Sequence, residues 1–286
     1  MEAVHHSPVD IANPGGRRKW VLYLSALEPV RLIVFVHGFG GKTVRAWHEF
    51  DSSGRTGAWW RESDLLFVGY ESLKERPGET AAWIRRRLPD FYPRLPPGIA
   101  TCREVSARTT AVKPYGELVL VGHSLGGLVL RIALLQQARS WLLQDRELDP
   151  NAPRPPLLDA TLRLFSPASA GFQPAGLLAM LTCVFSAGMV ALKGAPAFTA
   201  LRQESELLML TRSATESLIG NYYRELTALR AHIMWARPEQ VVEREGYQTD
   251  YEADSLIPIR SHIAVCKPTV GYEQPWHFVE TGKHGA

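Results

Sequence analysis

A strand-like apolar segment that ends in a glycine-rich turn constrains this chain more than any other feature. Residues 117–121 read as a buried strand, residues 122–127 form the run Gly-His-Ser-Leu-Gly-Gly, and a helical stretch follows to about Gln144. A G-x-S-x-G pattern between a strand and a helix is typical of a sharp turn that strains the serine backbone and exposes its hydroxyl group. The sequence therefore predicts that Ser124 stands above the edge of a sheet.

The neighbours of Ser124 support this interpretation. Gly122 and Gly126 lack side chains that would collide with the adjoining strand and helix. The helix directs free backbone N–H groups, that of Leu125 first, toward a developing negative charge. His123 belongs to the same motif. The alternative, an incidental serine in a glycine-rich turn, is disfavoured by the strand before it and the helix after it.

A second glycine-rich loop, residues 37–41, reads His-Gly-Phe-Gly-Gly and follows the apolar run 32–36. Such a loop supplies an N–H group, here that of Phe39, which joins the Leu125 N–H in an oxyanion hole. His37 is expected to be structural, with a hydrogen bond to the loop backbone. The loop is not a phosphate loop, because Val36 stands where that pattern needs glycine.

Strand and helix signals alternate along most of the chain, which favours an α/β fold with a mostly parallel sheet and helices on both faces. The segments expected to be strands are 32–36, 65–70, 117–121, 161–165 and 232–236. Residues 1–19 are expected to be a flexible N-terminal segment, and residues 20–286 a single domain.

The segment 164–192 contains no Asp, Glu, Lys or Arg, so a transmembrane helix has to be considered. Prolines and glycines interrupt its first half, and the remaining 177–192 is short for a membrane span. We expect instead a cap inserted at about 172–230, with an apolar helix over the acyl pocket.

Composition excludes several other classes of protein. Hydrophobic residues make up 45% of the 286 residues and charged residues 21%, as in an ordinary globular protein. The net charge of +3 is too small to indicate nucleic-acid binding. The three cysteines lie far apart and form no metal-ligand cluster, so we expect free thiols, a reducing compartment and no metal. No apolar leader follows Met1, which favours a cytoplasmic protein.

A general base is expected after Ser124, since enzymes with this turn place the acid and then the histidine later in the chain. His232, His262 and His277 follow the serine and lie clear of the terminus. His232 begins an expected strand, where the sheet would hold it. His262 follows the last expected strand and is preferred to His277.

Several carboxylates between residue 236 and His262 compete for the role of the acid. Glu239 is the first after the strand, in a loop from which it could reach the imidazole. Asp254 is only eight positions before His262, which leaves a short loop to fold the two together. Asp250 is a further rival. Glu239 is preferred, and Asp254 is the alternative acid.

These motifs resemble the α/β-hydrolase superfamily, and more narrowly its serine esterase and lipase-like branch with the SERAC-type and PGAP-type proteins. The likeness extends over about residues 30–270 and is carried by residues 37–41, 122–127 and 261–268. It implies a Ser-acid-His hydrolase without a cofactor that acts on small-molecule or lipid esters. Residues 236–242 are similar to the family's acid loop, with glutamate in place of the commoner aspartate. The supporting motif residues are His37, Gly38, Gly122, His123 and Gly126.

The sequence thus predicts an esterase or lipase-like enzyme with an acyl-enzyme on Ser124 and His262 as the base. Acyl transfer to an alcohol or amine, and thioester cleavage, would use the same residues. A catalytically silent lipid-binding or membrane-associated module is the alternative outside enzymes. Such an enzyme could contact a membrane surface, but its predicted activity does not require it.

Overall fold

A computed structural model describes residues 5–11, 18–52, 58–100, 113–173, 201–202, 205–252 and 258–283. The strands are β1 His6–Ile11, β2 Trp20–Ser25, β3 Arg31–Val36, β4 Ser63–Val68, β5 Glu117–His123, β6 Thr161–Phe165, β7 Ala231–Met234 and β8 Tyr251–Glu252. The helices are α1 Glu49–Ser52, α2 Ala58–Arg61, α3 Pro77–Arg87, α4 Pro97–Ala100, α6 Leu125–Ser140, α7 Arg146–Leu148, α11 Glu206–Asn221 and α12 Gln274–Thr281. Shorter turns are the 3-10 helices η1 Arg45–Trp47, η2 Leu88–Asp90, η4 Pro156–Asp159 and η5 Thr227–Leu229, and the π-helix η3 Trp141–Asp145.

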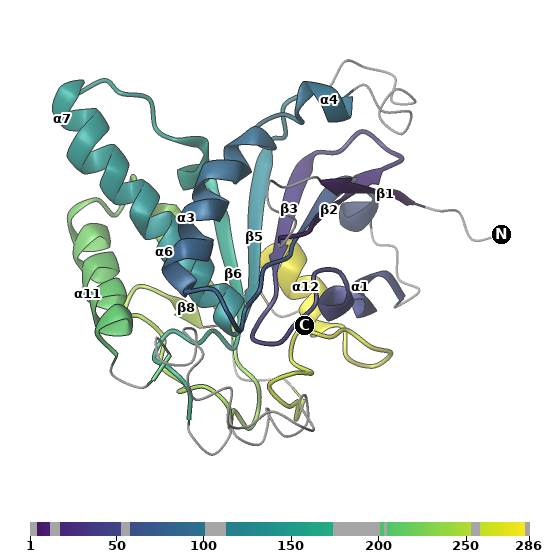
Figure 1. Ribbon diagram of the computed structural model, residues 1–286. Helices are drawn as coiled ribbons and strands as arrows, with labels where there is room; N and C mark the ends of the chain where they lie inside the picture. The colour runs from purple at the N-terminus through teal and green to yellow at the C-terminus, as the bar shows by residue number, and fades with distance from the viewer. Residues whose placement is uncertain are drawn as a thin grey trace.

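The strands form one sheet in the order β1-β2-β4-β3-β5-β6-β7-β8. β1 and β2 run antiparallel to their neighbours. The other six strands, β3 to β8, are parallel to one another. Figure 1 shows the sheet between helices on both sides. Each strand expected from the sequence is present with ends shifted by at most two residues, so the predicted mostly parallel α/β architecture is confirmed.

The N-terminal segment differs from the expectation of a flexible tail. Its residues 6–11 form β1, which pairs with β2 from His6 opposite Ser25 to Ile11 opposite Trp20. Exposure alternates along β1, as in an edge strand with one face turned to the protein. A strand of this kind depends on its partner more than on its own residues, and the partner is not evident from local pattern.

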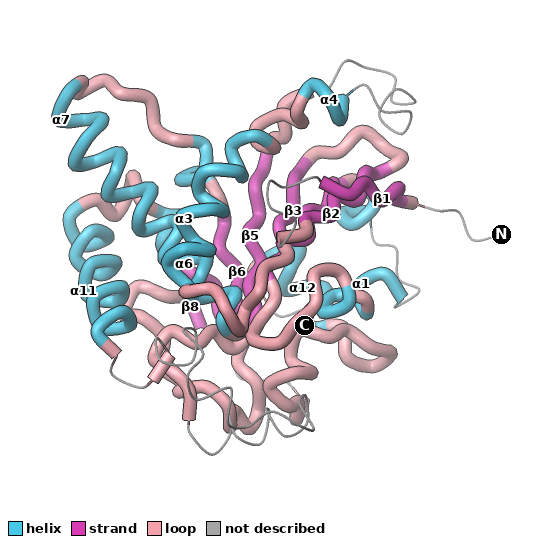
Figure 2. The backbone as a smooth tube through the Cα atoms, in the orientation of Figure 1, coloured by secondary structure: helices cyan, strands magenta, loops and turns pink. Residues whose placement is uncertain are grey.

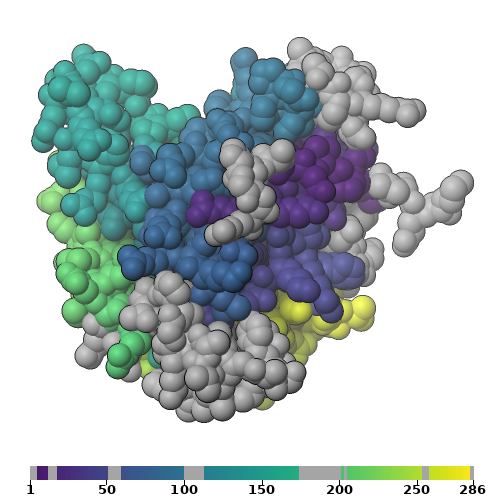
Figure 3. Space-filling view, viewed as in Figure 1, coloured from purple at the N-terminus to yellow at the C-terminus, as the bar shows by residue number. Residues whose placement is uncertain are grey.

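The continuous apolar run of β3 is explained by helices on both faces of the sheet. Leu32, Val34 and Val36 lie in a cluster with residues of α3, α6 and α11, while Ile33 and Phe35 lie in another with residues of α1, α2 and α12. Successive side chains of a strand point to opposite faces, so one run contributes to two cores. In the space-filling view, the teal atoms of α6 and α7 and the green atoms of α11 lie on one side of the molecule, and most of the purple atoms of β1 and β2 lie toward the other (Figure 3).

The loops that follow the parallel strands leave the sheet at one edge, because the strands share a direction. Figure 2 shows these loops gathered at the end of the sheet from which α6 starts. Of the cap expected at 172–230, the structure describes α11, which packs beside α6. The expected apolar cap helix at 177–192 lies outside the described residues, as does the rest of 174–200. No helix in the described ranges is long and apolar enough to cross a membrane.

Candidate active site

The turn between β5 and α6 holds Ser124 in a conformation that few residues adopt. Its φ is 53° and its ψ is −122°, outside the common wells for a side-chain-bearing residue. A Cβ at Gly122 would lie 2.7 Å from the Gly127 Cα, and one at Gly126 would lie 2.2 Å from the Val36 carbonyl oxygen. The glycines are therefore required by close backbone contact on both sides of the serine.

The two expected oxyanion-hole residues lie on either side of this turn. Leu125 is the first residue of α6, and Phe39 lies in the loop after β3. Gly38 brings the two loops together, since a Cβ there would lie 2.9 Å from the Ser124 Cβ. In the part of the chain that the structure describes, neither the Phe39 N–H nor the Leu125 N–H donates a hydrogen bond. Both donors are free to bind an oxyanion.

His37 anchors the Phe39 loop. Its ring stacks on Tyr70 with 4.5 Å between centroids, and its Nδ1–H donates to the Gly38 carbonyl oxygen at 2.8 Å. The Tyr70 hydroxyl donates in turn to the His37 carbonyl oxygen at 2.8 Å. Burial lowers the pKa of His37 to about 4, so the ring stays neutral. The expected hydrogen bond from a structural His37 to the loop backbone is confirmed.

The structure brings His262 and Glu239 together. The His262 Nδ1–H donates to the Glu239 carboxylate, with both oxygens at 3.0 Å, and both side chains are almost wholly buried. Glu239 also accepts hydrogen bonds from the backbone N–H groups of Val241 and Val242. Burial by itself would raise the pKa of Glu239, but the His262, Ser166 and backbone hydrogen bonds outweigh it and lower the pKa to about 2. Glu239 is therefore ionised at neutral pH.

This pairing decides which ring nitrogen of His262 is free. A carboxylate can only accept, so Nδ1 carries the hydrogen and Nε2 is left as an acceptor. Both His262 Nε2 and Ser124 Oγ are buried without a hydrogen-bond partner among the described residues. Hydrogen bonds between a base and a nucleophile are often long without substrate and tighten when substrate binds.

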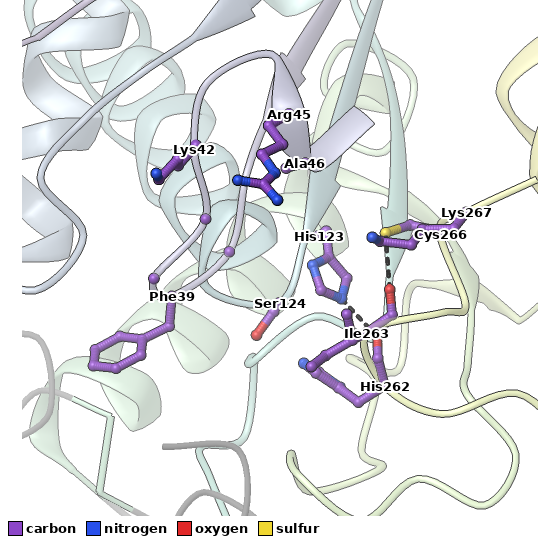
Figure 4. A pocket seen from close by; sticks show the side chains of 13 residues that line it. Phe39, Lys42, Arg45, Ala46, His123, Ser124, His262, Ile263, Cys266 and Lys267 are labelled. Atoms are coloured by element: carbon purple, nitrogen blue, oxygen red, sulfur yellow. Dashed lines mark hydrogen bonds between the residues drawn. The ribbon is translucent and has the colours of Figure 1, made fainter. Parts of the chain in front are cut away.

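Ser124 and His262 line one cavity of about 460 Å³. Figure 4 shows Ser124 between Phe39 on one side and the two histidines, His123 and His262, on the other. The remaining lining residues are Gly38, Gly40, Gly41, Lys42, Arg45, Ala46, Ile263, Cys266 and Lys267. The strand-end loops thus place a hydroxyl, an imidazole and the Phe39 loop around one space.

His123 secures the loop that carries His262. Its Nε2–H donates to the His262 carbonyl oxygen at 2.8 Å, and the two rings lie 4.9 Å apart. Burial, and next the charge that His262 can carry, lower the pKa of His123 to about 3. His123 therefore remains a neutral donor at neutral pH.

Ser166 belongs to the site although the sequence analysis did not single it out. It follows β6 with a φ of 38°, and its Oγ accepts a hydrogen bond from the Ala236 N–H at 2.8 Å. The hydroxyl also makes the hydrogen bond to Glu239 that helps to lower the pKa of this carboxyl. The signal available in the sequence was the position of Ser166 directly after β6. This strand pairs with β5, which leads to Ser124, and side chains that follow neighbouring parallel strands converge on one sheet edge.

Cys266 is a second potential nucleophile in the cavity, and its environment disfavours that role. Burial raises the pKa of its thiol to about 12, and a thiol that stays protonated is a poor nucleophile. The thiol faces the Ile263 carbonyl oxygen at 3.8 Å. Ser124 therefore remains the better candidate.

The rivals for the acid and the base are placed differently. Asp250 binds Arg131 with both carboxylate oxygens, at 3.1 and 2.6 Å, in a buried ion pair. Asp254 lies outside the described residues. His277 lies on α12, half exposed, and its Nδ1 lies 3.8 Å from a carboxylate oxygen of Glu280. His232 lies within β7, as predicted, and stacks on Tyr251.

The buried histidines predict acid sensitivity of the fold. Burial is the main cause of the lowered pKa of His37 and His123, about 4 and 3, whereas both rings titrate near 6.5 in an unfolded chain. Between pH 6.5 and 4 the unfolded state binds the extra protons, so the free energy of unfolding falls as pH falls, by at most about 1.4 kcal/mol per pH unit for each ring.

Urea unfolding of wild type and His37→Asn at several pH values between 7.5 and 4.5 measures this slope. We expect a shallower slope for His37→Asn, because the variant lacks one of the buried rings whose pKa is lowered in the folded protein. His48→Asn, at an exposed residue, is the matched control. Parallel curves for wild type and His37→Asn would contradict the expectation.

The comparisons with known proteins concern the fold. No protein-family model and no curated protein matches the chain by sequence. A carboxylesterase of the thaumarchaeon Nitrososphaera gargenis aligns with a TM-score of 0.51 and 12% identity over 96% of this chain and 98% of that one. Two further structures align more loosely. The carboxylesterase CesB of Bacillus subtilis has a TM-score of 0.49 and 11% identity over 98% of this chain and 93% of that one. The peroxisomal α/β-hydrolase Lpx1 of Saccharomyces cerevisiae has a TM-score of 0.43 and 10% identity over 97% of this chain and 85% of that one. The predicted α/β-hydrolase fold is confirmed.

Proposed function

We propose that this chain, an α/β-hydrolase by fold, is a serine hydrolase that cleaves carboxylic esters through an acyl-enzyme on Ser124. One observation carries the proposal: His262 donates its Nδ1–H to the buried Glu239, and its Nε2 is left as an acceptor with no hydrogen-bond partner among the described residues, in the cavity that Ser124 also lines. An imidazole held in this tautomer can take a proton from a serine hydroxyl. Similar structures include carboxylesterases, which agrees with such a reaction at the level of the fold.

The proposed reaction has two halves. The Ser124 Oγ attacks the ester carbonyl while His262 Nε2 takes the hydroxyl proton, and the Glu239 carboxylate stabilises the imidazolium. The Phe39 and Leu125 N–H groups bind the oxyanion, and the imidazolium then gives its proton to the departing alcohol. In the second half, His262 takes a proton from water, the hydroxide attacks the acyl-enzyme, and the carboxylic acid leaves as Ser124 regains its hydrogen.

Labelling with a fluorophosphonate probe tests the nucleophile directly, because the probe phosphonylates only an activated serine. Wild type should be labelled within minutes, and Ser124→Ala should not be labelled. Ser169→Ala is the matched control, since Ser169 is also a buried serine whose Oγ has no hydrogen-bond partner among the described residues. Equal labelling of wild type and Ser124→Ala would remove Ser124 from its proposed role, and an unlabelled wild type would favour the catalytically silent module.

Ser166 is expected to act by positioning Glu239. Replacing it with alanine removes a hydrogen bond to a carboxylate, and hydrogen bonds to charged groups contribute about 1.5 to 3 kcal/mol. We expect kcat/KM for p-nitrophenyl butyrate to fall about tenfold or more in Ser166→Ala. A double-mutant cycle separates positioning from general damage, because Ser166→Ala should cost almost nothing further in a Glu239→Gln background. Equal losses in both backgrounds would contradict this role.

A further inference from the structure

Besides its histidines, the cavity of Ser124 is lined by lysine and arginine side chains but by no acidic ones. Lys42, Arg45 and Lys267 lie in its wall, and no Asp or Glu of the described chain lines it. Lys267 is neutralised by an ion pair in which its Nζ lies 2.9 Å from the Glu49 Oε1. Lys42 and Arg45 are exposed, and neither forms an ion pair with any residue in the described ranges. Two positive charges without an acidic partner among the described residues therefore line the cavity of the proposed reaction.

These two cations are held by an ordered turn. Lys42 and Arg45 follow the Phe39 loop, and the Lys42 carbonyl oxygen accepts a hydrogen bond from the Ala46 N–H at 3.1 Å. The next residue, Trp47, is buried against Phe35, with 5.0 Å between the ring centroids. Figure 4 shows Lys42 and Arg45 on one side of Ser124 and His262 on the other.

Placing two like charges on one wall costs free energy that an anion between them would offset. The cavity walls also concentrate the field of these charges, because protein has a lower dielectric constant than water. An arginine guanidinium offers paired N–H donors to an oxyanion, and a lysine ammonium adds a point charge. Carboxylate and phosphate groups share the chemistry that this pair would recognise.

We propose that Lys42 and Arg45 form a subsite for an anionic group of the ester substrate, so that the enzyme acts on esters that carry a carboxylate or phosphate. This inference rests on the proposed ester hydrolysis at Ser124, and it adds the class of substrate. Lys42 and Arg45 line the same cavity as Phe39 and Ser124, so a single substrate molecule in this cavity would present both the anionic group and the reacting carbonyl.

Pairs of esters in which one member carries an anionic group and the other lacks it test the subsite. The carboxylate pair is mono-p-nitrophenyl glutarate and p-nitrophenyl valerate, and the phosphate pair is 1-butyrylglycerol 3-phosphate and 1-butyrylglycerol. We expect wild type to prefer the anionic member of at least one pair by roughly tenfold in kcat/KM at low salt. The pair that shows the preference identifies the anion, and added salt should reduce it.

The variant Lys42→Gln/Arg45→Gln should lose this preference. Arg86→Gln/Arg94→Gln is the control of equal charge change, since both arginines are exposed and neither lines the cavity. A wild-type enzyme without preference in either pair would overturn the proposal. A preference that survives in Lys42→Gln/Arg45→Gln would overturn it as well.

Binding to an inactive variant separates this inference from the proposed reaction. Calorimetric titration of Ser124→Ala with glutarate and with glycerol 3-phosphate requires no turnover. At least one anion should bind Ser124→Ala and bind at least tenfold more weakly when Lys42→Gln/Arg45→Gln is added. Unchanged binding would overturn the subsite even if wild type hydrolyses esters, and the expected loss would support it even if Ser124 failed the labelling test.

Discussion

Ser124→Ala is expected to lower kcat for p-nitrophenyl butyrate by about a millionfold, with a much smaller change in KM. The Oγ is the atom that we propose to form the acyl-enzyme, and Cys266, the other potential nucleophile of the cavity, is held as a thiol by its raised pKa. The remaining rate would come from the Phe39 and Leu125 donors and from substrate binding. Steady-state kinetics on wild type and variant at known protein concentration measure both constants.

Folding of Ser124→Ala has to be checked beside its activity. Alanine keeps the strained φ of 53° and removes only an oxygen that has no hydrogen-bond partner among the described residues. Its free energy of unfolding should therefore stay within about 1 kcal/mol of wild type. A loss of less than about a hundredfold in kcat for a stably folded Ser124→Ala would mean that water or another group attacks the ester.

Glu239→Gln is expected to lower kcat by about ten-thousandfold. The amide oxygen of glutamine can still accept from the Val241 and Val242 N–H groups, so its NH₂ group would face His262 Nδ1. Nδ1 would then have to act as an acceptor and Nε2 would carry the hydrogen. In that tautomer Nε2 cannot take the proton of Ser124.

The acid alternatives are compared in the same assay. Asp254→Asn should keep kcat within about threefold of wild type if Glu239 is the partner of His262. Asp250→Asn is informative about stability, because it breaks a buried ion pair with Arg131, and such a loss costs about 3 to 5 kcal/mol. A ten-thousandfold loss in Asp254→Asn with an active Glu239→Gln would assign the acid role to Asp254.

The central strands and the serine turn could be predicted because their signals are local. The run of β3 is apolar throughout since both faces of the strand are covered, and this needs no knowledge of the partners. Gly126 is required because a Cβ would lie 2.2 Å from the Val36 carbonyl oxygen, and such crowding at a strand-to-helix turn recurs wherever the motif occurs. β1, β2 and β8 were not predicted, because these strands at the two ends of the sheet depend on pairing with their neighbours more than on a local apolar pattern.

The sequence by itself determined the α/β architecture, the turn of Ser124, the Phe39 loop and a preference for His262 and Glu239 over their rivals. Only the tertiary structure decided that the His262 Nδ1–H meets the Glu239 carboxylate, that Ser166 supports it, and that Lys42 and Arg45 lack an acidic partner in the described chain. The physical reason is the range of the interactions. Apolar periodicity and glycine sterics act between near neighbours, whereas hydrogen bonds and ion pairs depend on loops that only the folded sheet brings together.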